Sequence, residues 1–192
     1  MKRKALENMD KRNKIALCID LDKTLILTDS LYESFVLSIK RNPLVLIFTP
    51  FWLARGKEFF KKKISEKVIL KLDKLPFNKK LIDVIINARA EGRATVLATA
   101  STKKIAEQIA KHLQLFDRVE SSNLSLNLKG KNKRDRLVEL FGEKGFDYAG
   151  DCFADIPIWA AANSAILVNP SKNLIKKVEQ ITKINKLIYT LK

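Results

Sequence analysis

Residues 15–24 read IALCIDLDKT, an apolar run that ends abruptly in two carboxylates. A short continuous apolar run of this kind is typical of a strand buried on both faces of a sheet. Three later runs share the pattern, each followed by a polar residue: residues 94–98 (ATVLA), 146–150 (FDYAG) and 165–168 (AILV). Apolar residues recur at helical spacing between them, over residues 103–113 and 134–141. This alternation predicts a Rossmann-like α/β fold, a parallel sheet with helices on both faces.

The segment at residues 31–77 interrupts the alternation. It is rich in Phe, Leu and Lys, has a helical pattern, and is much longer than a crossover between parallel strands requires. We therefore expect a small helical cap inserted between the first strand and the second. The predicted core comprises residues 12–30 and 78–192, and residues 1–11 form a basic tail. Residues 173–192 carry Leu and Ile between lysines and predict a final amphipathic helix.

Carboxylates follow two of the predicted strands. Asp20 and Asp22 lie two positions apart, so one can be a nucleophile or metal ligand and the other a general acid. Gly150 is followed by Asp151 and Asp155, whose carboxylates can converge on one hard cation. The ligand site of such a sheet lies beyond the carboxyl ends of its strands, so we expect these groups to meet there. Turn and helix-capping roles are the alternatives for both pairs.

A hydroxyl and a lysine complete the set. Thr99 ends the second strand with a helix N-terminus behind it, a place suited to a phosphoryl oxygen. A lysine from Lys129, Lys131 or Lys133 precedes the strand of Asp151, and most of these lysines are expected on a solvated face.

An acidic strand end, a hydroxyl strand end, a lysine and Gly-Asp-x-x-x-Asp, in that order, resemble the haloacid dehalogenase-like (HAD) hydrolases. The resemblance covers essentially the whole chain. It implies a phosphatase in which Asp20 is the nucleophile, forming an aspartyl-phosphate, and Asp22 is the acid/base. It also implies that Thr99 binds the transferring phosphoryl group.

The resemblance further implies bound Mg²⁺, held by Asp20, Asp151, Asp155 and the backbone carbonyl of Asp22. Lys133 best matches the lysine of the family, because apolar residues follow it at positions +4 and +7 on one helical face. Lys129 and Lys131 remain alternatives.

Three more residues concern the pocket. Ser101 and Asp29 are candidate substrate-binding residues, with helix capping as the alternative for each. Lys23 stands where the family often has Gly, which changes the loop but removes no chemical group.

Four stretches suggest a closer relative, and two of them are residues 97–101 (LATAS) and 154–162 (ADIPIWAAA). Residues 17–35 (LCIDLDKTLILTDSLYESF) and 127–151 (NLKGKNKRDRLVELFGEKGFDYAGD) resemble the HAD domain fused ahead of UbiA-type prenyltransferases in some bacterial membrane proteins. This resemblance implies a substrate phosphate on a polyprenyl-linked or other lipid-linked molecule; a phosphorylated small molecule is the alternative.

Composition sets the limits for these interpretations. The 192 residues include 37 Lys and Arg against 21 Asp and Glu, a net charge of +16 that points to an anionic partner. A hydrophobic content of 46% excludes a disordered chain. Two cysteines, Cys18 and Cys152, exclude a disulfide framework and indicate a reducing compartment. No apolar segment follows the N-terminal charges, so we expect a cytoplasmic protein, soluble or peripheral on the inner face of the membrane.

The uncharged run at residues 43–54 has two interpretations. The favoured one is the buried core of the cap, because the run is too short to span a bilayer. The other is a bilayer-interface segment, with Phe48, Phe51 and Trp52 as anchors beside basic residues, and the C-terminal helix shares that ambiguity. An alternative function follows, a basic binding module for membranes or nucleic acid with little turnover. Nucleic acid is disfavoured because the sequence lacks a basic strip interleaved with aromatic residues.

Overall fold

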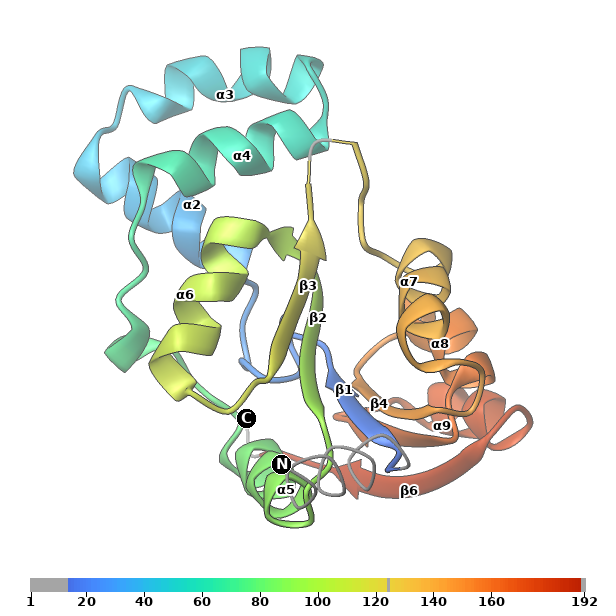
Figure 1. The fold of residues 1–192 in the computed structure, drawn as a ribbon. Coiled ribbons are helices and arrows are strands. Elements are labelled where there is room, and N and C mark those ends of the chain that lie inside the picture. The colour runs from blue at the N-terminus through green and yellow to red at the C-terminus, as the bar shows by residue number, and fades with distance from the viewer. Residues whose placement is uncertain (1–13, 124, 191–192) are drawn as a thin grey trace, which may run out of the picture.

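Six parallel strands form one sheet in the order β3-β2-β1-β4-β5-β6. The structure, a computed structural model, describes residues 14–123 and 125–190 (Figure 1). The predicted tail at residues 1–11 lies outside these ranges. The strands are β1 Ala16–Ile19, β2 Thr95–Thr102, β3 Arg118–Ser122, β4 Phe146–Gly150, β5 Ser164–Val168 and β6 Lys183–Ile188. The predicted Rossmann-like parallel sheet is confirmed.

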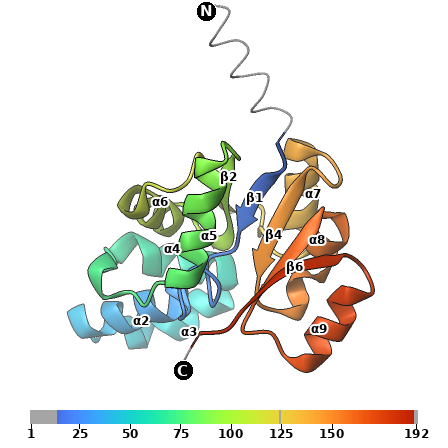
Figure 2. The same ribbon diagram turned by 90° about the horizontal axis from the view of Figure 1, so that it is seen from below.

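Helices cover both faces of the sheet (Figure 2). One face carries α5 Lys79–Ala90 and α6 Lys103–Leu113, and the other carries α7 Lys131–Phe141, α8 Ile156–Ala161 and α9 Lys172–Glu179. The central strand β1 is fully buried, and its side chains pack against the helices on both faces of the sheet. Leu17 and Ile19 join the apolar cluster under α5 and α6, whereas Ala16 and Cys18 join the cluster under α7, α8 and α9. Alternation of side chains along a strand explains why this short run is apolar at every position.

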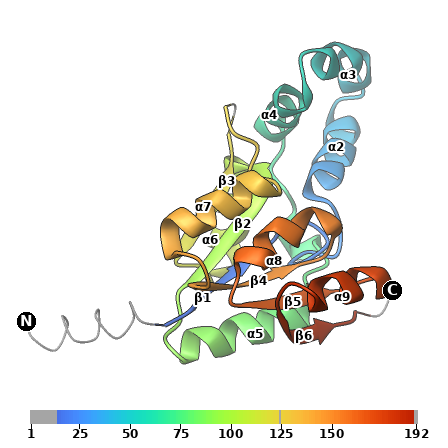
Figure 3. The same cartoon turned by 90° about the vertical axis from the view of Figure 1, so that its right-hand side faces the viewer.

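The connection from β1 to β2 begins with three helices that precede α5, in the segment where the sequence predicts a helical insertion. They are α2 Ser30–Arg41, α3 Val45–Ala54 and α4 Lys57–Lys67, followed by a short 3₁₀ turn, η1 Leu72–Lys74. Figure 3 shows them beyond one end of the sheet, with α3 farthest from it. Their shared core includes Phe60 and Ile64 of α4, packed with Phe35 of α2. This α2–α4 insertion (residues 30–67) stands over the carboxyl ends of the strands (Figure 1).

The C-terminal prediction is wrong. Within the described residues, the expected helix over 173–192 is instead α9, which ends at Glu179, followed by the edge strand β6. Pairing with β5 explains the change, because Ile184 and Ile188 contact the two apolar clusters of the sheet from the strand conformation. The spacing of these isoleucines fits both a helix and a strand, and the neighbouring sheet edge decides between them.

The favoured interpretation of residues 43–54 is also wrong. Most side chains of α3 face outward, and only Val45 and Trp52 are buried among them. None of the helices in the described ranges combines the length and apolar composition that crossing a bilayer requires.

Candidate active site

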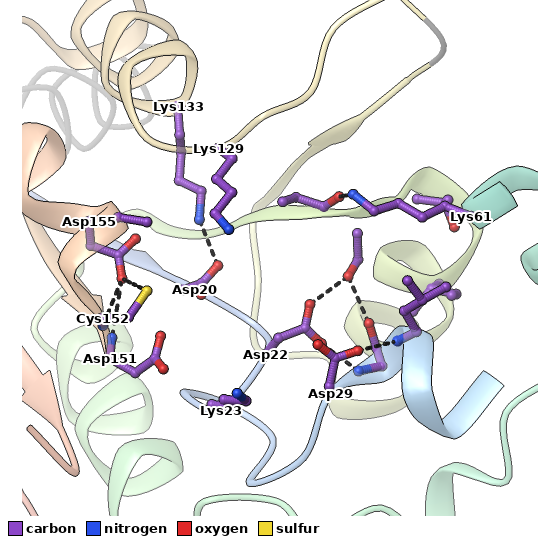
Figure 4. A pocket seen from close by; sticks show the side chains of 17 residues that line it. Asp20, Asp22, Lys23, Asp29, Lys61, Lys129, Lys133, Asp151, Cys152 and Asp155 are labelled. Carbon is purple, nitrogen blue, oxygen red and sulfur yellow. Dashed lines mark hydrogen bonds and ion pairs between the residues drawn. The ribbon is translucent and has the colours of Figure 1, made fainter. Parts of the chain in front are cut away.

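A pocket opens at the carboxyl ends of the central strands, beneath the α2–α4 insertion (Figure 4). Its lining includes five carboxylates, four lysines and several small polar groups. The charged lining residues are Asp20, Asp22, Asp29, Asp151, Asp155, Lys23, Lys61, Lys129 and Lys133. The loops after β1, β2 and β4 therefore bring together the residues that the sequence picks out at strand ends, with the exception of Thr99.

Asp20 stands directly after β1 and is fixed by the sheet. Its backbone N–H donates to the carbonyl of Ala149 on β4 at 3.0 Å, which continues the parallel ladder past the strand end. Its Oδ1 accepts a hydrogen bond from Nζ of Lys133 at 2.6 Å. Burial raises the pKa of Asp20 to about 7, with Lys133 opposing the rise and the carboxylates of Asp155 and Asp22 adding to it.

Lys133 links Asp20 to the second acidic cluster, Asp151 and Asp155. Its side chain is only 3% exposed, and its Nζ also donates to the hydroxyl of Tyr148 at 2.9 Å. The Tyr148 hydroxyl in turn donates to Oδ1 of Asp155 at 3.1 Å. Burial disfavours the ammonium, but Asp20 and Asp155 outweigh it and raise the pKa of Lys133. The lysine is therefore held as a buried cation at the base of the pocket.

Tyr148 is a site residue that sequence reasoning missed. It lies inside the apolar strand β4, two residues before Gly150, and its ring contacts Trp159 edge-on in the core. The signal that could have found it is its phenol, because a buried hydroxyl requires a hydrogen-bond partner.

Asp22 is oriented by two serines. Its Oδ1 accepts from the backbone N–H of Ser30 at 2.6 Å, and its Oδ2 accepts from the hydroxyl of Ser101 at 2.7 Å. The two serine hydroxyls also lie 2.7 Å from one another. Burial raises the pKa of Asp22 above its ordinary value, against the lowering effect of these hydrogen bonds. A carboxyl group with a raised pKa that is held in one orientation suits a general acid.

Lys23 occupies a conformation that normally favours glycine. Its φ is 58°, in the left-handed region where a Cβ is sterically disfavoured, and its N–H donates to the carbonyl of Thr28 at 3.0 Å. The loop thus keeps the backbone shape for which glycine is suited while adding an exposed cation to the pocket lining.

Asp151, Cys152 and Asp155 form a possible metal-ligating group. Their carboxylate and thiol atoms all lie within 4.8 Å of one another. Burial and the neighbouring Asp155 raise the pKa of Asp151 to about 6. Burial also raises the pKa of the Cys152 thiol to about 12. Sulfur is a soft ligand and does not suit a hard cation such as Mg²⁺. The remaining donors are the hard carboxylate oxygens of Asp151 and Asp155, and Asp20 lines the same pocket. Carboxylate oxygens of this kind fit Mg²⁺.

Gly150 makes room for this cluster. A Cβ at this position would lie 2.5 Å from Oδ2 of Asp155 and 2.9 Å from the Tyr148 ring. The same Oδ2 accepts the backbone N–H groups of Asp151 at 3.2 Å and Cys152 at 3.4 Å. These bonds close the 3₁₀ turn η2 Phe153–Asp155. Asp155 is also the N-cap residue of α8, its alternative interpretation, but it makes no side-chain cap bond to that helix. Its remaining lone pairs are available to an ion.

The structure does not bring the hydroxyl of Thr99 into the pocket. Strand β2 continues to Thr102, and its pairing with β3 shifts register between Thr99 and Thr102. Thr99 is fully buried, and its Oγ1 accepts the backbone N–H of Ser101 at 3.0 Å. Ser101 and Thr102 line the pocket instead, so the hydroxyl at the strand end is displaced by two residues from the predicted position.

Thr102 also marks the start of α6. It is the N-cap residue but makes no side-chain cap bond, and its Oγ1 is buried without a hydrogen-bond partner. The α6 N-terminus and a free hydroxyl thus meet at the pocket lining, an arrangement suited to an anion.

The remaining candidates are placed as follows. Asp29 lines the pocket but caps α2, because its Oδ1 accepts from the N–H groups of Leu31 at 2.9 Å and Tyr32 at 3.0 Å. Lys129 lines the pocket beside Lys133, whereas Lys131 is exposed and not part of the lining. Of the three lysines that the sequence left open, Lys133 is the one that contacts Asp20.

Lys61 is a lining residue that no sequence motif indicates. It belongs to α4, and its Nζ donates to Glu58 at 3.0 Å and to the carbonyl of Ala100, at the end of β2, at 3.3 Å. The α2–α4 insertion therefore contributes a cation to the pocket and contacts the core beside it (Figure 4).

The fold and site together describe an α/β protein with a buried carboxylate–lysine pair at the end of its central strand. Three comparisons with known proteins were informative to different degrees, and only the solved structures bear on the fold. No protein-family model matches the chain. The chain is 39% identical over 168 residues to the uncharacterized protein y4nM of Sinorhizobium fredii (strain NBRC 101917 / NGR234). The match covers 87% of this chain but only 32% of that protein, so the chain spans about a third of its curated relative.

Similar solved structures include HAD-family phosphatases. A protein of unknown function from Bordetella pertussis Tohama I has a TM-score of 0.66 at 17% identity, covering 92% of this chain and 98% of the other. The HAD family hydrolase t0658 from Salmonella enterica serovar Typhi has a TM-score of 0.64 at 15% identity, and the match covers 90% of this chain and 66% of the other. A phospho-aspartyl intermediate analogue of phosphoserine phosphatase has a TM-score of 0.60 at 15% identity, covering 92% and 93%. The chain therefore shares the fold of the HAD hydrolases.

Proposed function

We propose that this protein is a Mg²⁺-dependent phosphomonoester hydrolase that works through an aspartyl-phosphate on Asp20. The observation that carries the proposal is the contact between Asp20 and Lys133 at the pocket base, with a second acidic cluster beside it. Burying such a charged pair is costly, and a pocket that only binds an anion would have no need of a carboxylate at its centre. The fold shared with phosphatase structures supports the same class of reaction.

In the first step, a carboxylate oxygen of Asp20 attacks phosphorus. An O–P bond forms to Asp20 while the bond from phosphorus to the ester oxygen breaks. Lys133 lies beside the attacking oxygen, where its ammonium stabilises the charge on the phosphoryl oxygens. Asp22, protonated when the substrate arrives, gives its proton to the leaving alcohol.

In the second step, Asp22 acts as a base. Its carboxylate takes a proton from a water molecule, which attacks the phosphorus of the aspartyl-phosphate and breaks its bond to Asp20. Inorganic phosphate leaves and the Asp20 carboxylate is restored. The hydrogen bonds from Ser30 and Ser101 hold Asp22 in place for both transfers.

Asp20, Asp151 and Asp155, with the Asp22 carbonyl that the family resemblance implies, would hold the cation. When bound, Mg²⁺ supplies positive charge that offsets the repulsion between carboxylates and phosphate. The α6 N-terminus and the unpartnered hydroxyl of Thr102 are suited to the outer phosphoryl oxygens.

The substrate class is set by the rest of the pocket. We propose that the α2–α4 insertion acts as a cap, because its Lys61 reaches the pocket beside the end of β2. Lys23 and Lys129 add two more exposed cations to the lining. This charge favours a substrate with anionic groups near its phosphate, either a phosphorylated small molecule or a lipid-linked phosphate.

The test is hydrolysis of p-nitrophenyl phosphate by the purified chain, with Mg²⁺ and with EDTA. We expect turnover that requires Mg²⁺ and falls by at least about 10³-fold in Asp20→Asn. Lys131→Met, which changes an exposed lysine near the site, is the matched control. Turnover by Asp20→Asn at the wild-type rate would overturn the proposal, and so would its absence from wild type on this ester and on a panel of metabolite and polyprenyl phosphates.

A further inference from the structure

Helix α3 presents an apolar surface that no other part of the described ranges, residues 14–123 and 125–190, covers. Its ten residues, VLIFTPFWLA, include no charged side chain. The large apolar side chains exposed on α3 and the residue before it are Leu44 (56%), Leu46 (51%), Ile47 (71%), Phe48 (50%), Phe51 (63%) and Leu53 (46%). Single exposed apolar residues need no explanation, but six within ten positions of one short segment are a concentration of the kind that marks an interaction site.

The helix is firmly seated on the rest of the insertion. Val45 and Trp52, two turns apart on one side of α3, are 2% and 7% exposed and join the apolar cluster of Phe60 and Ile64. The ring of Phe48 stacks on Trp52 with centroids 6.0 Å apart. The narrow stripe at Val45 and Trp52 is thus enough to hold α3, and its remaining circumference faces away from the molecule.

Basic residues border this patch. Lys40 and Arg41 lie in the last turn of α2, and Arg55 and Lys57 follow α3 directly. The guanidinium of Arg55 lies 4.3 Å from the centre of the Phe59 ring. Residues 30–67 contain eight Lys and Arg against three Glu. Helix α3 has no polar face of its own, and the positive charge lies on the residues at its two ends. Exposed apolar side chains flanked by basic residues suit the surface of an anionic bilayer, where the apolar groups enter the acyl boundary and the cations meet the headgroups.

We propose that α3 docks this protein on the surface of an anionic membrane, with Ile47 and Phe51 inserted among the lipids and the basic border on the headgroups. A helix of ten residues is about 15 Å long, half the thickness of the hydrocarbon core, so it lies in the interface and does not span. A second copy of the chain is the weaker occupant. It would bring two cationic borders together on molecules that each carry a net charge of +16, whereas anionic lipid neutralises them.

The experiment is vesicle co-sedimentation of the whole chain at low salt. One set of vesicles is phosphatidylcholine alone, and the other is phosphatidylcholine and phosphatidylglycerol in equal parts. We expect binding to the anionic vesicles that weakens with added salt, and at least about tenfold weaker binding in the variant Ile47→Asp/Phe51→Asp. Ile86→Asp on α5, where Ile86 is 47% exposed, is the matched control and should bind as wild type does.

Each other outcome overturns the proposal. These are no binding by wild type, equal binding to neutral vesicles, and undiminished binding by the double variant. Sedimentation velocity adds a fourth: a wild-type dimer that the double variant dissociates, without vesicle binding, would make α3 an interface between copies. The double variant should keep its wild-type melting temperature, because both side chains are exposed. Its hydrolysis of p-nitrophenyl phosphate in solution should also be unchanged, which separates this proposal from the proposed catalysis.

Discussion

Nζ of Lys133 lies 2.6 Å from Oδ1 of Asp20, although 113 residues separate the two in the chain. The contact joins the end of β1 to the first turn of α7. It therefore exists only when the sheet and the helix α7 on one of its faces are assembled. Tyr148 and Asp155 extend it into a chain of hydrogen bonds across the pocket base. The proposed catalysis would therefore use four side chains that also connect β1, β4 and α7.

Replacing Lys133 should abolish most of the activity. Lys133→Met removes the cation beside the nucleophile, and we expect kcat to fall by about 10²-fold or more. Lys131→Met on the same helix changes an exposed lysine and should stay within about twofold of wild type. Steady-state kinetics with p-nitrophenyl phosphate measures both, and equal effects of the two variants would refute the assignment of Lys133.

Gly150→Ala should weaken metal binding. The new Cβ would lie 2.5 Å from Oδ2 of Asp155 and force that carboxylate to move. We expect the Mg²⁺ concentration for half-maximal activity to rise by about tenfold, since groups that orient a metal site affect affinity on this scale. A Mg²⁺ titration of activity measures this, and an unchanged midpoint would show that Asp155 does not serve the ion.

Without metal, Asp151 should destabilise the protein above pH 6. Its pKa of about 6 in the folded state exceeds the ordinary Asp value of 3.8, so the folded state binds more protons between these values and stability falls as pH rises through them. In EDTA at pH 8, we expect Asp151→Asn to unfold with a free energy about 1 kcal/mol higher than wild type, after allowance for solvent screening. The difference should vanish near pH 3.5.

Urea unfolding at several pH values measures this difference. Adding Mg²⁺ at pH 8 should stabilise wild type more than Asp151→Asn, because the variant lacks one ligand. A variant that is less stable than wild type at pH 8 in EDTA would contradict the account of an acidic cluster awaiting a cation.

Ser101 and Thr99 should have different roles. Ser101→Ala removes a hydrogen bond to Asp22, and we expect kcat to fall by about tenfold with little loss of stability. Thr99→Val leaves the N–H of Ser101 without its acceptor, so the free energy of unfolding should fall by about 1–2 kcal/mol with kcat nearly unchanged. Kinetics and urea unfolding on both variants separate the two. The reverse pattern would restore Thr99 as the functional hydroxyl.

The sequence alone predicts the central sheet well, because strands buried on both faces are marked by continuous apolar runs. It also predicts which carboxylates share the pocket, since strand ends determine their position whatever the loops do. Lys133 could be preferred over Lys129 and Lys131 because apolar residues follow it on one face of the helix.

What the sequence missed depends on long-range contacts. Tyr148 and Lys61 acquire their roles only from neighbours across the fold, Asp155 in one case and the end of β2 in the other. The displaced hydroxyl at Ser101 follows from the length of β2 and its irregular pairing with β3, which no local pattern reveals. The prediction that residues 43–54 are buried was wrong for a related reason. An apolar helix is expected to be buried, and the sequence does not show that the neighbouring elements leave this one exposed.

The most direct test of the central claim is to trap the phosphoenzyme. The Asp22→Asn variant is mixed with p-nitrophenyl phosphate and Mg²⁺, quenched in acid and digested for mass spectrometry. Because p-nitrophenolate leaves without a proton, Asp20 should still be phosphorylated while its hydrolysis is slowed. The account predicts an acid-stable, hydroxylamine-labile phosphoryl group on the peptide that contains Asp20, absent from Asp20→Asn/Asp22→Asn. The proposed mechanism would be contradicted if wild type releases phosphate and Asp22→Asn releases p-nitrophenolate, but no phosphoryl group is found on Asp20 of that variant.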